Sequence, residues 1–128
     1  MIDASVAVRA CGRDAGFAVL GDAQLVAPPL LWSECRSAIR EATWRGQIDA
    51  ADGVATYARL ARCPVERRAP ARLHAETWLV ADELGWAKTY DAEYVALARI
   101  LGCRLVTLDG RLKRGAERLG LVISADEL

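Results

Sequence analysis

Four acidic residues stand at positions where a carboxylate could do chemistry. Asp3 and Asp109 each follow a short apolar run typical of a β-strand, so both are predicted at carboxyl ends of strands. Glu34 and Asp91 lie on predicted helices, three or four residues from apolar neighbours, and are therefore predicted to project from the apolar helix faces. Four converging carboxylates repel one another strongly without a cation. Oxygen-only ligands suit Mg²⁺ or Mn²⁺, so the pattern favours a metal site.

A site of this kind can orient and deprotonate a water for in-line attack on a phosphodiester, with a second ion stabilising the leaving oxygen. Each acid also has a simpler explanation. Asp3 and Asp109 could cap the helices that follow them, and Asp91 could be a carboxylate favoured by a helix dipole. Glu34 lies in the middle of its helix, where its simpler explanation is a buried salt bridge to an arginine.

The elements that must hold these acids alternate along the chain. Gly102 is predicted to end the helix that carries Asp91, and Gly46 the one that carries Glu34. A further helix over residues 50–61 is predicted to turn Val54 and Tyr57 inward. Strands are predicted at residues 1–3, 25–27, 64–67, 104–109 and 121–123, and helices from Ser5 and over 15–20, 30–44, 50–61, 70–84, 89–101 and 111–119. Such alternation indicates an α/β fold, a three-layer α/β/α sandwich with a central, mainly parallel sheet.

Length and charge restrict the kind of protein. A chain of 128 residues is predicted to form a single domain over residues 1–128. Its 17 basic and 17 acidic side chains cancel, so a nucleic-acid partner must be held by a local basic patch or by metal. The longest apolar stretch, residues 17–31, is interrupted by Asp22 and Gln24 and is too short for a membrane span. No signal peptide is evident at the N-terminus.

The four cysteines, Cys11, Cys35, Cys63 and Cys103, form no CxxC pair, and the chain has one histidine. This composition disfavours a zinc site. We interpret the cysteines as small core residues in a reducing compartment, which predicts a cytoplasmic protein.

Four segments carry a resemblance to a known family: IDASVAV at residues 2–8, PPLLWSECRSAIR at 28–40, TYDAEYVALA at 89–98 and LVTLDGRL at 105–112. In this order and spacing they resemble PIN domains, in particular the VapC-type toxins of type II toxin–antitoxin systems. The resemblance implies a metal-dependent endoribonuclease that cleaves RNA phosphodiester bonds, uses Mg²⁺ or Mn²⁺, and pairs with an inhibitory VapB-like antitoxin. Residues matching the family's acidic quartet are Asp3, Glu34, Asp91 and Asp109, and those matching its accompanying hydroxyls are Ser5 and Thr107.

Other polar and aromatic residues have less specific patterns. Glu93, two residues beyond Asp91 on the same helix, is predicted to be solvated. Basic residues near the strand-end rim that could hold RNA phosphates, or form an ordinary mixed-charge surface, are Arg9, Arg13, Lys88, Arg111, Lys113 and Arg114. Core or interface packing is favoured over base stacking for Trp32, Trp44, Trp78 and Trp86.

Large apolar residues around Trp44, Tyr57 and Trp78 exceed the needs of one small core. They predict a two-fold homodimer and a separate contact to an antitoxin segment.

Three alternative functions are weighed against the toxin. A PIN nuclease of RNA processing would share the acids but lack an antitoxin. A catalytically silent binding module is disfavoured because all four acids are present. A phosphoacceptor receiver would need paired acids after the first strand and a central strand-end aspartate, which the chain lacks.

Overall fold

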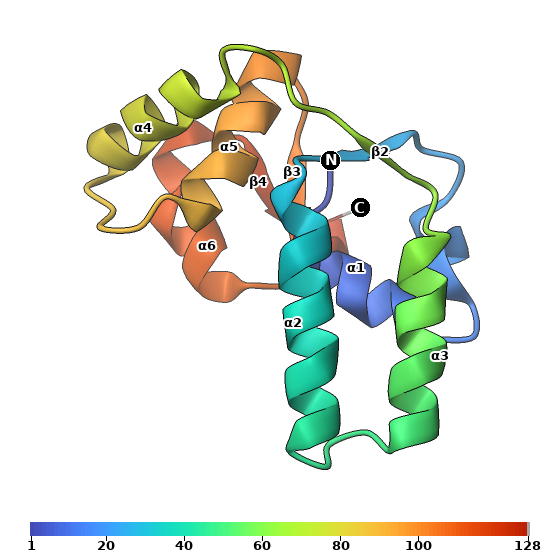
Figure 1. The fold of residues 1–128 in the computed structure, drawn as a ribbon. Coiled ribbons are helices and arrows are strands. Elements are labelled where there is room, and N and C mark those ends of the chain that lie inside the picture. Colours follow the sequence, from blue (N-terminus) through green and yellow to red (C-terminus); the bar gives the residue numbers. More distant parts are fainter. Residues whose placement is uncertain (128) are drawn as a thin grey trace.

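Short parallel strands form the centre of the molecule (Figure 1), which a computed structural model describes over residues 1–127. β1 (Leu25–Ala27) pairs in parallel with β2 (Val65–Arg67), and β3 (Leu105–Thr107) pairs in parallel with β4 (Val122–Ser124). β1 and β3 are buried along their whole length, as expected for strands covered on both faces.

The N-terminal segment joins the two strand pairs. Ile2 forms a single parallel bridge with Val106 of β3, and its backbone N–H donates to the carbonyl of Val26 in β1 at 3.3 Å. The terminal ammonium of Met1 donates to the carbonyl of Arg104 at 3.0 Å. The segment therefore lies between β1 and β3. Although it is short, its hydrogen bonds to strands on both sides hold it in place.

Helices flank the strands on both sides (Figure 1). α1 (Ala4–Cys11), α2 (Leu30–Trp44) and α3 (Ala50–Ala61) pack against one another, and α2 and α3 form an antiparallel hairpin that extends away from the strands. α4 (Leu73–Leu84) packs on α5 (Tyr90–Leu101), while α6 (Gly110–Gly115) contacts β3 and β4. Short 3₁₀ helices cover Gly16–Leu20 (η1), Glu117–Leu119 (η2) and Ala125–Glu127 (η3).

α5 is the most deeply buried helix, and its contacts show how the sequence positions it. Tyr94 and Leu97 are almost fully buried, in agreement with the predicted apolar stripe. Arg99 anchors the helix to α4 through ion pairs with Glu76 at 3.1 Å and Glu83 at 2.7 Å. Gly102 then ends α5 with a φ of 62°, a left-handed conformation that favours glycine, and turns the chain into β3.

The predicted α/β sandwich and its parallel pairing are confirmed, and the strand and helix order agrees with the sequence-based prediction. Some boundaries differ. The helix predicted from Pro70 begins at Leu73, and the one predicted over 111–119 is divided into α6 and η2. Residues 15–20 form a 3₁₀ turn rather than an α-helix. In the described residues no helix has the length and apolar character that a membrane span requires.

Two residues predicted to face inward from α3 face outward. Val54 and Tyr57 are 69% and 52% exposed, and the buried residues are Gly53, Thr56 and Leu60. The reason is a close approach between α3 and α2: a Cβ atom at Gly53 would lie 2.4 Å from the Thr43 hydroxyl oxygen. The missing side chain at Gly53 thus allows the contact, and the larger apolar residues turn outward.

This contact predicts an unusual response to a Gly→Ala substitution. In a helix interior, Gly→Ala normally stabilises the folded state by about 1 kcal/mol, whereas overpacking costs about 1–3 kcal/mol. The Thr43 hydroxyl cannot easily move aside, because it donates to the Ile39 carbonyl at 2.8 Å. We expect Gly53→Ala to lower the free energy of unfolding in urea titrations. The Thr43→Ala/Gly53→Ala double variant should recover it, with Thr43→Ala alone as the control. A single Gly53→Ala variant as stable as the parent protein would contradict the close approach.

Candidate active site

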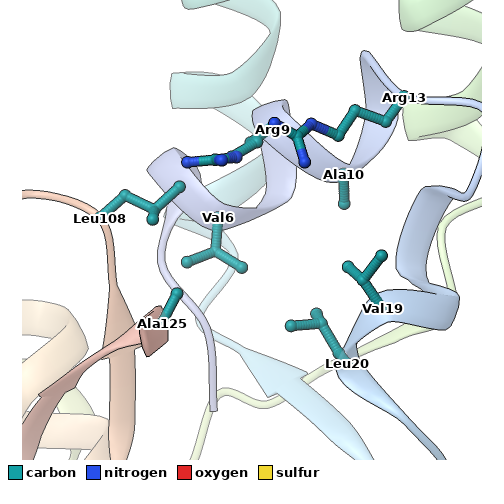
Figure 2. Close-up of a pocket in the computed structure, with 8 residues that line it drawn as sticks. All are labelled: Val6, Arg9, Ala10, Arg13, Val19, Leu20, Leu108 and Ala125. Atoms are coloured by element: carbon teal, nitrogen blue, oxygen red, sulfur yellow. The ribbon is translucent and has the colours of Figure 1, made fainter. Parts of the chain in front are cut away.

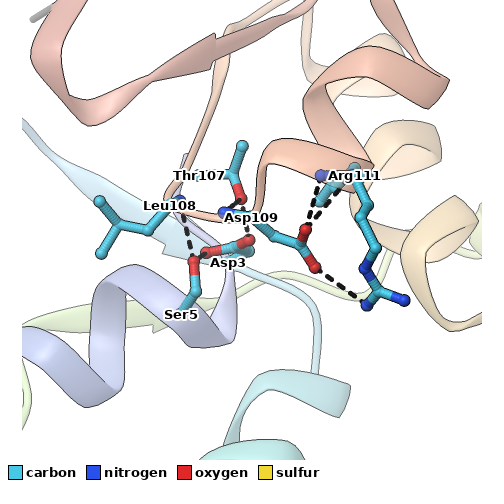
Figure 3. A network of polar contacts seen from close by, with 7 residues as sticks. Asp3, Ser5, Thr107, Leu108, Asp109 and Arg111 are labelled. Carbon is cyan, nitrogen blue, oxygen red and sulfur yellow. Dashed lines mark hydrogen bonds and ion pairs between the residues drawn. The ribbon is translucent and has the colours of Figure 1, made fainter.

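Asp3 forms the centre of a buried hydrogen-bond network at the carboxyl end of the N-terminal segment (Figure 3). Its carboxylate is 5% exposed and caps α1 by accepting the Val6 backbone N–H at 3.1 Å. The hydroxyl of Ser5 donates to the same oxygen at 2.6 Å, and the hydroxyl of Thr107 donates to the other through a short hydrogen bond. Ser5 and Thr107, the two hydroxyls singled out in the sequence, therefore both bond to Asp3, and the carboxylate that caps α1 also accepts their hydrogen bonds.

Asp109 lies next to this network, where β3 passes into α6. Its backbone N–H donates to the Thr107 hydroxyl at 2.8 Å, and its carboxylate caps α6 by accepting the Arg111 backbone N–H at 2.7 Å. The Arg111 guanidinium pairs with the second carboxylate oxygen at 3.3 Å. Burial acts to raise the pKa of Asp109, but the hydrogen bonds from Arg111 and Leu112 outweigh it and lower the pKa below its usual value.

Glu34 projects from α2 and meets α5. The Tyr94 hydroxyl donates to its Oε2 atom at 2.5 Å, and Tyr94 itself is 2% exposed. Within residues 1–127 no basic side chain pairs with Glu34, so the salt bridge considered for it is absent. Burial raises the pKa of Glu34, the Tyr94 hydrogen bond opposes this, and the charges of Asp91, Asp3 and Glu93 raise it further.

Asp91 lies in the first turn of α5, three residues before the buried Tyr94, and is exposed. It was predicted to project from the apolar helix face, but this end of α5 lies at the rim of the molecule, so the position meets solvent rather than the core. An open hollow of about 610 Å³ lies there, lined by Glu34, Asp91, Lys88, Arg111 and neighbouring residues. Desolvation and the charges of Asp109 and Asp3 raise the pKa of Asp91, against the effect of Arg111.

Glu93 also differs from its prediction, because it is half-buried rather than solvated. Burial raises its pKa, opposed by the charge of His74, and its own charge raises the pKa of Glu34. The sequence patterns indicate no site role for Tyr94, and for Arg111 they allow either a phosphate contact or a mixed-charge surface. The missed signal for Tyr94 is a phenol at a core position three residues after Asp91, since a buried hydroxyl needs a hydrogen-bond partner.

The four predicted acids are connected through shared neighbours: Glu34 and Asp91 line one hollow with Arg111, and Arg111 pairs with Asp109. Asp109 and Asp3 both bond the Thr107 hydroxyl. Among the described residues, however, no three acidic, histidine or cysteine side chains form a cluster that could hold an ion as they stand. The donor set fits a hard cation in its chemistry, being four carboxylates with hydroxyls beside them. Holding one would require the acids to draw closer, with Arg111 giving up part of its contact to Asp109.

The six predicted RNA-contacting cations fall into different environments. Lys88 and Arg111 line the hollow beside Glu34 and Asp91, whereas Arg9 and Arg13 line a second hollow over α1. Lys113 is engaged in an ion pair with Glu127, and Arg114 is exposed on α6.

Two of the tryptophans pack and two do not. Trp32 packs beneath the Arg67 guanidinium, 4.7 Å from its ring centroid, and Trp86 packs against the core. Trp44 and Trp78 are 77% and 71% exposed. All four cysteines are free thiols; Cys11 and Cys35 are buried and the other two half-buried.

Comparisons with known proteins agree with this fold. The PIN-domain pattern matches residues 1–118, so the chain belongs to the PIN-domain family. It is 37% identical over 113 residues to the VapC ribonuclease Mb0985 of Mycobacterium bovis and to ribonuclease VapC9 of Mycobacterium tuberculosis, covering 88% of this chain and 87% of each relative. Within the family the chain is therefore of the VapC type. The crystal structure of PAE2754 from Pyrobaculum aerophilum superposes with a TM-score of 0.73 at 27% identity, covering 98% of this chain and 90% of that one.

The raised pKa of Glu34 gives a prediction about pH. Because the folded state holds the Glu34 proton more tightly than the unfolded state, burial of the charge destabilises the fold at neutral pH. That cost disappears as the pH falls through the raised pKa. In EDTA, Glu34→Gln should therefore have a higher free energy of unfolding than the parent at pH 7.5. The difference in free energy of unfolding between the two proteins should shrink toward pH 5. In the variant, the Tyr94 hydroxyl can still donate to the amide oxygen of the introduced glutamine.

The control is Glu41→Gln on the same helix, where an exposed Glu41 pairs with Arg45 at 2.5 Å. This variant should show no gain at pH 7.5. A loss of about 3–5 kcal/mol for Glu34→Gln, as when a buried ion pair loses one partner, would show that Glu34 stabilises the fold.

Proposed function

We propose that this protein is a metal-dependent endoribonuclease that hydrolyses RNA phosphodiester bonds, and the toxin partner of a VapB-like antitoxin. The observation that carries the proposal is that Glu34 and Asp91 line one open hollow with Lys88 and Arg111, and that Arg111 pairs with Asp109. Asp109 in turn bonds Thr107, which bonds Asp3. The related VapC proteins are named ribonucleases, and the family assignment covers most of the chain. We also propose that the protein acts in the cytoplasm, where its RNA substrates are found.

The donor set supports Mg²⁺ or Mn²⁺ as the cofactor. Asp3, Glu34, Asp91 and Asp109 would hold it, and when bound it would polarise a phosphate oxygen and lower the pKa of a water. Asp91 makes no side-chain hydrogen bond within the described residues, so its oxygens are available. Glu34 uses Oε2 for Tyr94 and keeps Oε1.

The chain's own residues divide the remaining work. The three donors to Asp3 fix its carboxylate and couple it to β3. Lys88 and Arg111, on the hollow's wall, supply positive charge for the RNA phosphates. A carboxylate of the quartet accepts the proton of the attacking water, so no covalent intermediate on the protein is required.

A second candidate function is RNA processing by a PIN nuclease without an antitoxin. Expression of the chain in a bacterium with and without its neighbouring gene separates the two. If the protein is a toxin, its expression alone stops growth, and co-expression of the neighbouring gene restores growth. If it is a processing enzyme, the neighbouring gene has no such effect. Sequencing of new RNA 5′ ends in the same cells would identify the cleaved sites.

Asp91→Asn tests the catalytic assignment. The change keeps the size of the side chain but removes the charge that a hard cation needs. We expect RNA cleavage to fall at least about a hundredfold, with the fold intact because Asp91 is exposed. The control is Asp82→Asn, an exposed acid on α4. Cleavage near the parent's rate in matched metal would remove Asp91 from the site.

Metal binding should also appear as a stability change. A ligand that binds only the folded state adds about 2.7 kcal/mol at a hundredfold excess over Kd, an upward Tm shift on the order of 10 °C for a domain of this size. Millimolar Mn²⁺ should raise the Tm of the parent but not of Asp91→Asn. An equal shift in both proteins would place the cation elsewhere.

The exposed apolar surface supports two partners. Trp78 and Leu79 on α4 are 71% and 58% exposed, and we propose this face for a two-fold homodimer. Between α2 and α3 lies a groove of about 420 Å³ whose walls include Ile39 and Tyr57, and we propose it for an antitoxin segment. Trp78→Glu should give a monomer in light scattering yet remain inhibited by antitoxin, and Tyr57→Glu should do the reverse. A parent protein that is monomeric at tens of micromolar would argue against the dimer.

A further inference from the structure

A second hollow lies over α1, away from the 610 Å³ hollow beside Glu34 and Asp91 (Figure 2). It has a volume of about 200 Å³, and we call it the α1 hollow. Its apolar lining is contributed by α1, η1, the residue after β3 and η3, namely Val6, Ala10, Val19, Leu20, Leu108 and Ala125. Figure 2 shows the side chains of Arg9 and Arg13 running along α1 beside these residues. An apolar floor with a basic edge is thus present in one place.

The α1 hollow is directly connected to the acidic site. Leu108, which lines it, donates its backbone N–H to the Ser5 hydroxyl at 2.9 Å, and Ser5 in turn donates to Asp3 at 2.6 Å. Arg9 lies four residues after Ser5 on α1, and is therefore one helical turn further from the acids. Arg13 follows just beyond the end of α1 at Cys11, so a strand of RNA entering the acidic site can pass Arg9 and then Arg13.

The two arginines have no carboxylate partner in the part of the chain that the structure describes. The acid nearest to Arg13 in sequence, Asp14, lies 3.7 Å from Arg59 instead. In a chain of zero net charge, two such cations at one rim form a local basic patch. Their complement is a phosphate or another anion.

Unusual exposure of apolar side chains marks the same place. Val19 is 61% exposed and Leu108 is 37% exposed, and both line the α1 hollow. The hollow is smaller than the pockets of about 300–1,000 Å³ that take drug-sized ligands. It suits one planar group with an apolar face.

Resting on the proposed ribonuclease function, we propose that the α1 hollow receives one unstacked base of the single-stranded RNA substrate next to the cleaved phosphate, while Arg9 and Arg13 hold the flanking phosphates. The apolar lining offers no side-chain hydrogen bond to a base edge. The hollow therefore favours an accessible, unpaired nucleotide over a particular base, as in other sites where bases pack on side chains. It makes the nuclease selective for single-stranded segments and loops.

Binding of a short, fluorescein-labelled single-stranded RNA to the Asp91→Asn protein tests the proposal without cleavage. When Arg9→Ala or Arg13→Ala is added to the Asp91→Asn protein, fluorescence anisotropy in Mg²⁺ should show about tenfold weaker binding, because one charge-assisted contact is lost. Each variant should also lower the slope of log affinity against log salt by about 1. The charge control is Arg118→Ala on η2, which lines neither hollow.

The apolar floor is tested by a matched pair of exposed valines. Val19→Asp should weaken RNA binding about tenfold, whereas Val54→Asp on α3, which is 69% exposed, should not change it. An abasic nucleotide can also be placed at each position of the same RNA in turn. Binding to the Asp91→Asn protein should weaken only when the abasic nucleotide lies at one position beside the cleaved phosphate. That penalty should vanish when Val19→Asp is added, because the base no longer enters the hollow.

The outcomes separate this proposal from the function on which it rests. If the Asp91→Asn protein binds no RNA and the parent cleaves none, the ribonuclease function and the base site are both wrong. If the parent cleaves and binds RNA but Val19→Asp behaves like Val54→Asp, only the base site is wrong. If Val19→Asp weakens inhibition by antitoxin and leaves RNA affinity unchanged, the α1 hollow belongs to the antitoxin.

Discussion

The short hydrogen bond from Thr107 to Asp3 is the contact on which the site and the sheet both depend, because it joins residues 104 positions apart. A buried carboxylate costs several kcal/mol unless donors replace its water. Asp3 receives three donors, from Ser5, Val6 and Thr107. One of them comes from its own helix cap and one from β3, so satisfying this charge also holds the N-terminal segment in the sheet.

The four acids lie in two different environments. Asp3 and Asp109 are held by hydrogen bonds at helix starts, and the Arg111 contacts lower the pKa of Asp109. Glu34 and Asp91 have raised pKa values, from burial first and then from the neighbouring carboxylates. One half of the site is therefore fixed by the fold, and the other half keeps charge that a bound cation could neutralise. Sites of this kind exchange some stability for function.

A neutral chain can still present a surface suited to RNA, because its charges are unevenly placed. Among the described residues, six of its 17 basic side chains form ion pairs, as Arg99 does with Glu76 and Glu83. Those beside the acids and along α1 lie where a phosphate backbone would pass. Of the exposed aromatic residues, Tyr90 lines the hollow beside the acids, whereas Trp78 on α4 and Trp44 and Tyr57 on the α2–α3 hairpin line neither surface proposed for RNA.

Local sequence patterns correctly predict the order of strands and helices and the parallel pairing of the strands, and they single out the four acids as candidates. Those features follow from local periodicity, from breakers such as Gly102, and from carboxylates placed at strand ends. Sequence could not show that Val54 and Tyr57 face outward, since the direction of α3 depends on the absent side chain of Gly53 meeting Thr43 of α2. Nor could it show that Tyr94 bonds Glu34, that Asp91 is exposed, or that Leu108 lies against Ser5. Each of these was decided by tertiary structure, because each depends on how two elements distant in the chain approach one another, whereas periodicity reports only the faces of one element.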